Sequence, residues 1–95
     1  MDKRKAYEEK LAAQLEEWSA QLALFKAKAS KASAEAKIEY CTITENLQHK
    51  HDKAWTKLQE LKSASDVAWE GLKTAAEHAW NDVKNAFHDA ASKFK

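Results

Sequence analysis

Four side chains that can bind a metal ion lie close together near the middle of the chain. Cys41, Glu45 and His49 follow one another at intervals of four residues, and Asp52 comes three residues after His49. On an α-helix this spacing brings the four groups onto roughly one face. Thiolate, imidazole and carboxylate groups are ligands for zinc or copper, so these residues form a candidate metal site. We favour the alternative of a plain solvated face, because a metal site on helices usually takes ligands from a second helix.

The sequence carries no pattern of a known catalytic site. It lacks H-E-x-x-H, G-x-S-x-G and a glycine-rich phosphate loop, and it has no Glu-x-x-His pair for a di-iron centre. Gly71 is the only glycine and there is no proline, so the chain has few means of forming an oxyanion hole or a strained nucleophile turn. We therefore expect a protein that is not an enzyme and binds no cofactor.

The charge pattern argues against nucleic acid as a partner. Sixteen basic and fifteen acidic residues are interleaved, which gives a net charge of +1, whereas a DNA- or RNA-binding protein normally has a one-sided basic surface. A single cysteine excludes an internal disulfide framework. The N-terminus lacks the apolar segment of a secretory signal, and no stretch of about 18 apolar residues could span a membrane. We expect a soluble, cytoplasmic protein.

The elements that would position these residues are helices. Alanine, lysine, glutamate and leucine, all strong helix formers, dominate the composition, and turn residues are nearly absent. From Leu11 to Leu72, apolar residues recur every three or four positions, within a band of about 100° on a helical wheel. This apolar stripe predicts long amphipathic helices that pack along one side. Its mean period is close to 3.6 residues, so any supercoil should be weak.

The apolar stripe is widest over residues 65–95, where a short pattern repeats after eleven residues. The Ala-Trp-x-x-Leu-Lys of residues 68–73 returns as Ala-Trp-x-x-Val-Lys in residues 79–84. Eleven residues make about three helical turns, so the repeat stacks on one face and widens the apolar arc to roughly 140°. Three tryptophans lie toward the edge of this arc, where an indole can contact a lipid interface, a partner helix or a second copy: Trp55, Trp69 and Trp80.

Two positions could hold a chain reversal. Thr42 with Glu45 and Ser63 with Asp66 have the spacing of a capping box, and residues 41–44 are the only run of poor helix formers. The apolar stripe keeps one phase across both positions, which favours one helix or a gently interrupted one. However, an unbroken helix of about 90 residues would be about 135 Å long and could not bury its own stripe, so the chain must bend back or pair.

We predict an all-α fold without β-strands, made of long amphipathic helices in an antiparallel coiled coil or helical-hairpin bundle. It should be a single coiled-coil-like domain over residues 1–95, with a break near 41–46 or 63–66. A break near 41–46 would give two arms of nearly equal length.

The function predicted from these features is that of a non-enzymatic structural or interaction protein that self-associates through the apolar stripe as a dimer or larger homo-oligomer. The residues expected to form the contacts are Leu11, Leu15, Trp18, Leu22, Phe25, Leu47, Leu58, Leu61, Trp69, Leu72, Trp80, Val83 and Phe87.

An alternative is that the Trp-rich face protects a membrane surface or unfolded client proteins. Helices at lipid surfaces favour a basic polar face, whereas the polar face here is acidic at its centre and neutral in total. Packing against other helices is therefore the preferred interpretation of the Trp-rich face. A third hypothesis for the function is metal binding near Cys41 and His49.

Residues 1–15, 31–40 and 58–95 resemble small bacterial coiled-coil-domain-containing proteins, some of them grouped with stress-inducible proteins. The opening Met-Asp-Lys-Arg-Lys-Ala-Tyr-Glu-Glu-Lys-Leu carries part of this likeness, while residues 41–55 depart from it. The resemblance implies a helical coiled coil with a stress-related role and transfers no site residue. The eleven-residue period is also similar to that of desiccation-protective and apolipoprotein-like helices, which implies surface or membrane protection under stress.

Overall fold

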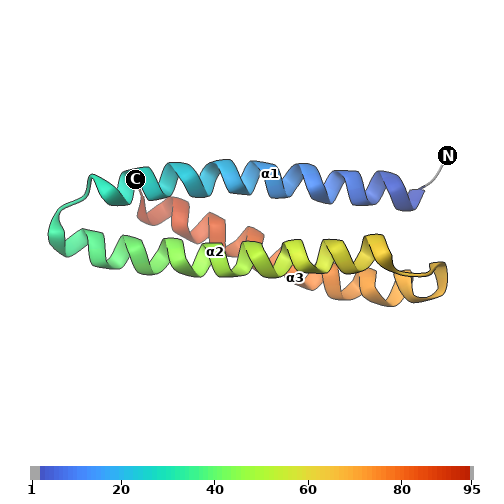
Figure 1. Ribbon diagram of the computed structural model, residues 1–95. Helices are drawn as coiled ribbons and strands as arrows, with labels where there is room; N and C mark the ends of the chain where they lie inside the picture. The colour runs from blue at the N-terminus through green and yellow to red at the C-terminus, as the bar shows by residue number, and fades with distance from the viewer. Residues whose placement is uncertain (1–2, 95) are drawn as a thin grey trace.

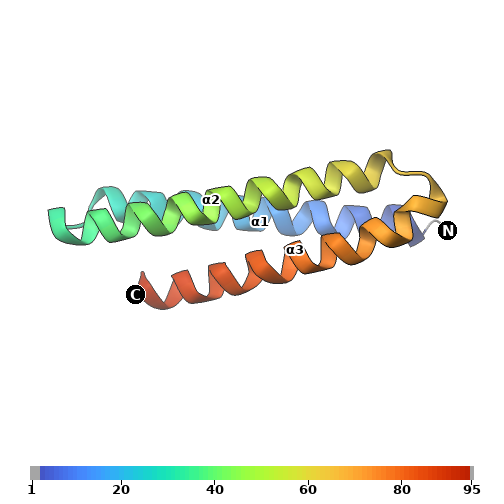
Figure 2. The same cartoon turned by 90° about the horizontal axis from the view of Figure 1, so that it is seen from below.

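The computed structural model describes residues 3–94, which form three α-helices running back and forth along one rod (Figure 1). Helix α1 spans Lys3–Ser30, α2 spans Ala34–Ser63 and α3 spans Asp66–Lys93. Consecutive helices are antiparallel, so α1 and α3 run parallel to each other (Figures 1 and 2). The rod measures 51 × 20 × 18 Å. The all-α prediction is confirmed, and residues 3–94 contain no strand.

The first reversal lies at residues 31–33, where the sequence pattern predicted none. Lys31 and Ala32 donate backbone hydrogen bonds of 3.2 Å to carbonyls in the last turn of α1. Ser33 then caps α2, because its backbone is extended and its Oγ accepts a 3.3 Å hydrogen bond from the Ala36 amide. A serine oxygen at this position satisfies one of the free N–H groups that every helix start exposes.

The break predicted near 41–46 is wrong, because α2 continues through this stretch. The hydroxyls of Thr42 and Thr44 donate 3.0 Å hydrogen bonds to the carbonyls of Ile38 and Cys41 in the same helix. Both threonines bond to the helix that contains them instead of capping a new one. The chain is therefore a bundle of three helices with 28, 30 and 28 residues, and not the two-armed hairpin that a break near 41–46 would have given.

The second reversal lies at residues 64–65, within the predicted 63–66 stretch. The capping residue is Ser65 and not Ser63: its Oγ accepts a 3.3 Å hydrogen bond from the Ala68 amide. Asp66 follows in the first turn of α3, where a negative charge interacts favourably with the helix dipole.

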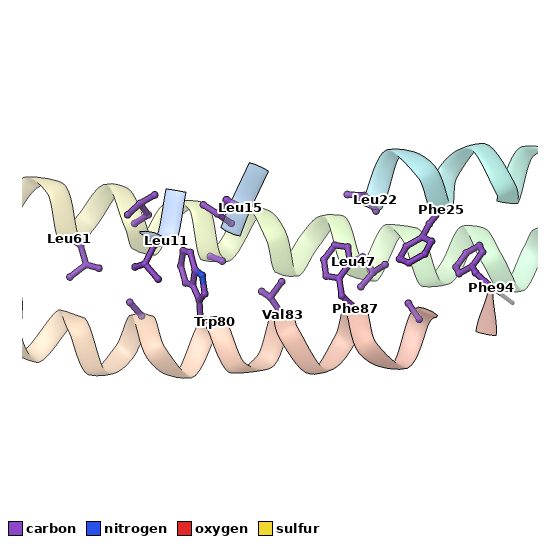
Figure 3. Packing of buried hydrophobic residues seen from close by; sticks show 14 of the residues in the cluster. Leu11, Leu15, Leu22, Phe25, Leu47, Leu61, Trp80, Val83, Phe87 and Phe94 are labelled. Carbon is purple, nitrogen blue, oxygen red and sulfur yellow. The ribbon is translucent and has the colours of Figure 1, made fainter. Parts of the chain in front are cut away.

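The hydrophobic core extends along the rod and takes side chains from all three helices (Figure 3). Helix α2 packs closely against both α1 and α3, whereas α1 and α3 meet mainly through large side chains. The largest fully buried side chains are Leu47, Leu58, Leu61 and Val83. Burying each such side chain contributes roughly 1.5–3 kcal/mol, so one chain gains substantial stabilisation by covering its own apolar stripe.

Candidate functional site

The residues predicted to contact a second chain lie in the interior of one chain. Eleven of the thirteen are at most 7% exposed: Leu11, Leu15, Leu22, Phe25, Leu47, Leu58, Leu61, Trp69, Trp80, Val83 and Phe87. The other two, Trp18 and Leu72, are partly buried against the same core. The apolar stripe is thus covered within the folded chain. Any association of folded copies needs a different surface.

The parallel helices α1 and α3 are joined by a row of aromatic rings that the sequence analysis missed. Three pairs in this aromatic row are each 62 residues apart in sequence: Tyr7 with Trp69 at a centroid distance of 5.6 Å, Trp18 with Trp80 at 5.9 Å, and Phe25 with Phe87 at 6.1 Å. The spacing of these aromatic residues in the sequence already indicated the pairing. Aromatic residues at positions 7, 18 and 25 are eleven and then seven apart, and those at 69, 80 and 87 repeat both intervals.

Phe94 ends the aromatic row near the turn between α1 and α2. Its ring stacks on Phe25 with centroids 4.7 Å apart and lies 4.5 Å from the Tyr40 ring. The Lys28 ammonium donates a 3.4 Å hydrogen bond to the Phe94 carbonyl. The end of α3 is therefore attached to both α1 and α2.

At the other end of the rod, Arg4 connects all three helices. Its Nη2 donates to the carbonyls of Leu61 at 2.9 Å and Ala64 at 2.6 Å, and its Nη1 donates to Asp66 Oδ1 at 3.0 Å. Its Nε donates to Glu8 Oε2 at 3.0 Å. The hydrogen bond to Glu8 raises the pKa of Arg4 against the opposing effect of burial, so the guanidinium stays charged. A cation at the C-terminal carbonyls of α2 is favourable and stabilises the turn that follows.

An aromatic pair lies directly beside Arg4. Trp69 Nε1 donates a 3.0 Å hydrogen bond to Glu8 Oε2, and the Lys73 ammonium lies 5.0 Å from the Tyr7 ring centroid and 5.7 Å from the Trp69 ring centroid. The Tyr7 hydroxyl donates to Glu77 Oε1 at 3.4 Å. Burial, followed by the negative charge of Glu77, raises the pKa of Tyr7 above its ordinary value. These contacts attach the start of α1 to the first turns of α3.

The metal candidates Cys41, Glu45, His49 and Asp52 all lie on α2. Cys41 is an exposed free thiol. Asp52 Oδ1 accepts a 2.9 Å hydrogen bond from the Gln48 side chain. Within residues 3–94, no three His, Cys, Asp or Glu side chains are grouped closely enough to hold a metal ion. α1 does not supply the second-helix ligands that a site here would need. The side chain that it places beside this part of α2 is that of Lys26, which hydrogen-bonds Gln48 at 2.9 Å.

His51 of α2 is a helix-contact residue. Its Nε2 lies 3.3 Å from the Leu15 carbonyl of α1, and because a carbonyl can only accept, this contact requires the hydrogen on Nε2. The Nδ1 atom is buried without a hydrogen-bond partner, 3.6 Å from the Asp52 carboxylate. The ring fixes one point of the α1–α2 contact.

Trp55 differs from the other three tryptophans because 52% of its surface is exposed. It lines an open groove of about 290 Å³ between α1 and α2, to which α3 contributes no residue. The residues around Trp55 in this groove are Ala12, Leu15, Glu16, Ser19, His51, Leu58, Gln59 and Lys62. We call it the Trp55 groove. Of the three tryptophans placed at the edge of the arc, Trp69 and Trp80 are core residues, so the expected outward-facing role fits Trp55 alone.

Within residues 3–94, no helix is both long enough and apolar enough to cross a membrane. Comparison of the chain with protein-family models, with curated proteins and with solved structures finds no match. The resemblance to coiled-coil-domain-containing proteins therefore stays a prediction.

Proposed function

We propose that the protein is a non-enzymatic structural protein whose folded three-helix bundles self-associate through their outer surface. The observation that carries this proposal is the position of its large apolar side chains. The apolar stripe is covered inside one chain, yet among residues 3–94 four large apolar residues remain on the outside: Trp55 at 52% exposure, Leu24 at 56%, Ile38 at 74% and Val67 at 91%. Covering such surface with a second copy is favourable, and a net charge of +1 gives two copies little mutual repulsion.

Sedimentation equilibrium over a concentration series, with circular dichroism on the same samples, tests the proposal. We expect constant helicity together with a reversible shift from the 10.8 kDa chain to a species of twice that mass. A folded bundle that keeps the mass of one chain at every concentration would contradict self-association.

A second candidate is stress-related protection of membranes or unfolded proteins by an opened bundle. The aromatic row supports it, because α1 and α3 meet mainly through rings and α3 can separate from α1 without breaking its own helix. Separation would expose Trp69, Trp80 and Phe87 on one side of α3, a wide apolar face suited to a lipid surface.

Anionic vesicles of phosphatidylglycerol with brominated acyl chains test this candidate in the Trp55→Phe variant. The remaining tryptophans lie at least partly within the core, so bromine can quench their emission strongly only if the bundle opens onto the lipid. Unchanged emission at high lipid concentration would reject the opened-bundle candidate and leave self-association unaffected.

A further inference from the structure

Three lysines of α2 line one side of a groove between α2 and α3. Lys50, Lys53 and Lys57 follow one another at intervals of three and four residues, which places them on one face of the helix over about 10 Å of its length. The groove has a volume of about 550 Å³, and α3 contributes the residues Ala75, His78, Ala79 and Asp82 to it. We call it the lysine groove. Charges counted along the sequence hide this row of lysines, because acidic and basic residues are interleaved throughout the chain.

The lysine groove holds more positive than negative charge. Within residues 3–94, Asp82 is the one acidic residue that lines it, and its Oδ2 accepts a 2.8 Å hydrogen bond from the Lys50 ammonium. Lys57 pairs with Glu60 of its own helix at 3.4 Å, a weak contact because both side chains are partly exposed to water. Lys53 is exposed, and its side chain forms no ion pair within the same part of the chain. Two of the three lysines are therefore available to an anion from solution.

Beyond the pair of Lys50 and Asp82, α3 lines the groove with small, uncharged side chains. These are Ala75 and Ala79, so no carboxylate of α3 fills the space in front of the other two lysines. His78 is exposed at the same stretch of α3, where an imidazole N–H can donate a hydrogen bond to an anion. The groove thus offers donors from both helices and room between them.

Acidic residues near both ends of the row limit the length of an anion that fits. Glu60 lies one helical turn beyond Lys57, and Asp82 lies at the opposite end of the row. Asp89 lines the next stretch of the α2–α3 groove beyond Asp82. These carboxylates repel a long polyanion such as a nucleic acid strand, whereas a compact anion between them meets mainly the lysines.

Phosphate groups have the charge density that this short row of lysines requires. A phosphate monoester carries about 1.5 to 2 negative charges near neutral pH, and lysine is a common phosphate ligand. Two or three phosphates held close together can contact more than one lysine at once. Because the whole chain has a net charge of only +1, it has no general attraction for anions, so binding depends on the local row.

We propose that the lysine groove binds a compact anion with two or three phosphate groups, contacted by Lys53 and Lys57 from α2 and by His78 from α3. Lys50 stays paired with Asp82 and closes one end of the site. A free polyphosphate compound and the phosphorylated headgroup of a lipid present the same chemistry to the groove. The site does not depend on the proposed self-association.

Isothermal titration calorimetry with inorganic tripolyphosphate at low ionic strength tests the site. We expect one ligand per chain and an affinity that falls roughly tenfold in Lys53→Gln, the loss expected for one charge-assisted hydrogen bond. Lys84→Gln is the matched control and should bind as the wild type does. Lys84 is also exposed and forms no ion pair within residues 3–94, but it lies outside the lysine groove.

Circular dichroism shows whether each variant is folded, and Lys57→Gln repeats the measurement if Lys53→Gln is not. Lys53→Arg, which keeps the charge, should retain most of the affinity. Equal losses in Lys53→Gln and Lys84→Gln would show attraction to the chain as a whole and overturn the proposal, as would a wild type that does not bind tripolyphosphate. Neither result bears on self-association, which sedimentation equilibrium measures without phosphate.

Vesicles distinguish the two sources of the phosphates. Phosphatidylinositol bisphosphate presents several phosphates on one headgroup, whereas phosphatidylglycerol presents one. Binding to vesicles with the first lipid and not the second, together with binding of tripolyphosphate, shows that a lipid headgroup can occupy the groove. Binding of tripolyphosphate without either vesicle identifies a free compound. A short single-stranded oligonucleotide that binds more tightly than tripolyphosphate would overturn the restriction to a compact anion.

Discussion

Arg4 is in the first turn of α1, where its charge opposes the dipole of its own helix, and beside the last turn of α2, where the charge is favourable. Its guanidinium donates to three carbonyls and two carboxylates. From the sequence alone, Arg4 would be taken for an ordinary surface charge. In the fold it connects the beginning of α1 to the α2–α3 turn. Sequence reasoning could not find this role, because Arg4 reaches these acceptors only when α1 lies antiparallel along α2 and its first turn meets the end of that helix.

Arg4→Ala should lower the thermal unfolding midpoint by several degrees, because the last carbonyls of α2 lose their donor. Arg4→Lys should fall between this variant and the wild type, since an ammonium keeps the charge but cannot reach several acceptors in one plane as a guanidinium does. Thermal unfolding followed by circular dichroism measures this order. Equal midpoints for Arg4→Lys and the wild type would show that only the charge matters.

Tyr7 should make the bundle less stable at alkaline pH. Burial and the neighbouring Glu77 raise the pKa of Tyr7 in the folded chain, so folding favours the neutral phenol. The contribution is fully present below the unfolded pKa of about 10 and is lost as pH rises through the higher folded value. Urea unfolding at a series of pH values should show a smaller alkaline loss in Tyr7→Phe than in the wild type. Parallel curves would contradict a role for Tyr7 ionisation.

At the scale of the helices, the two turns explain what the sequence did and did not predict. The apolar stripe identified core residues such as Leu11 and Val83, because periodicity reports which side of a helix is buried, whatever covers it. The turns depend on single capping serines, and a serine before an acidic residue is common in a charged sequence. The constant phase of the apolar stripe was misleading as a sign of one continuous helix, because each of three helices in a bundle turns an apolar face inward.

Ser65→Ala should cost about 1 kcal/mol of unfolding free energy, because the Ala68 amide loses its acceptor at the start of α3. Ser63→Ala is the matched control. It lies two residues earlier, is exposed and caps no helix, so its effect should stay within about 0.5 kcal/mol. Urea denaturation of the two variants tests whether the second helix break is set by Ser65. A larger loss for Ser63→Ala would indicate that the helix cap is Ser63, two residues earlier.

At the scale of the molecule, the aromatic row determines how α1 and α3 pack. Phe87 stacks on both Trp18 and Phe25, with centroid distances of 6.0 and 6.1 Å, so it contributes to two successive contacts between these helices. Because the paired rings are each 62 residues apart in sequence, they set the register in which α1 packs along α3. The periodicity of the apolar stripe alone could not predict this register, since the same stripe is compatible with a hairpin of two helices.

Phe87→Ala should cost about 3–5 kcal/mol, because it leaves a cavity between α1 and α3. Phe87→Leu keeps most of the volume and should cost less than about 1.5 kcal/mol. Leu24→Ala, a truncation at a residue that is 56% exposed, serves as the surface control and should be nearly neutral. Chemical denaturation of the three variants measures these differences. A small effect of Phe87→Ala would mean that α3 is stabilised by its contact with α2 alone.

Three is an odd number of helices, so the chain enters the bundle at one end and leaves at the other (Figure 1). Arg4 lies beside the α2–α3 turn and Phe94 beside the start of α2, near opposite ends of a rod 51 Å long. A segment joined before α1 and another joined after α3 would thus be separated by most of the rod's length. The bundle has the geometry of a molecular spacer, and tension applied at its two ends would pull along the helix axes, shearing the aromatic row between α1 and α3.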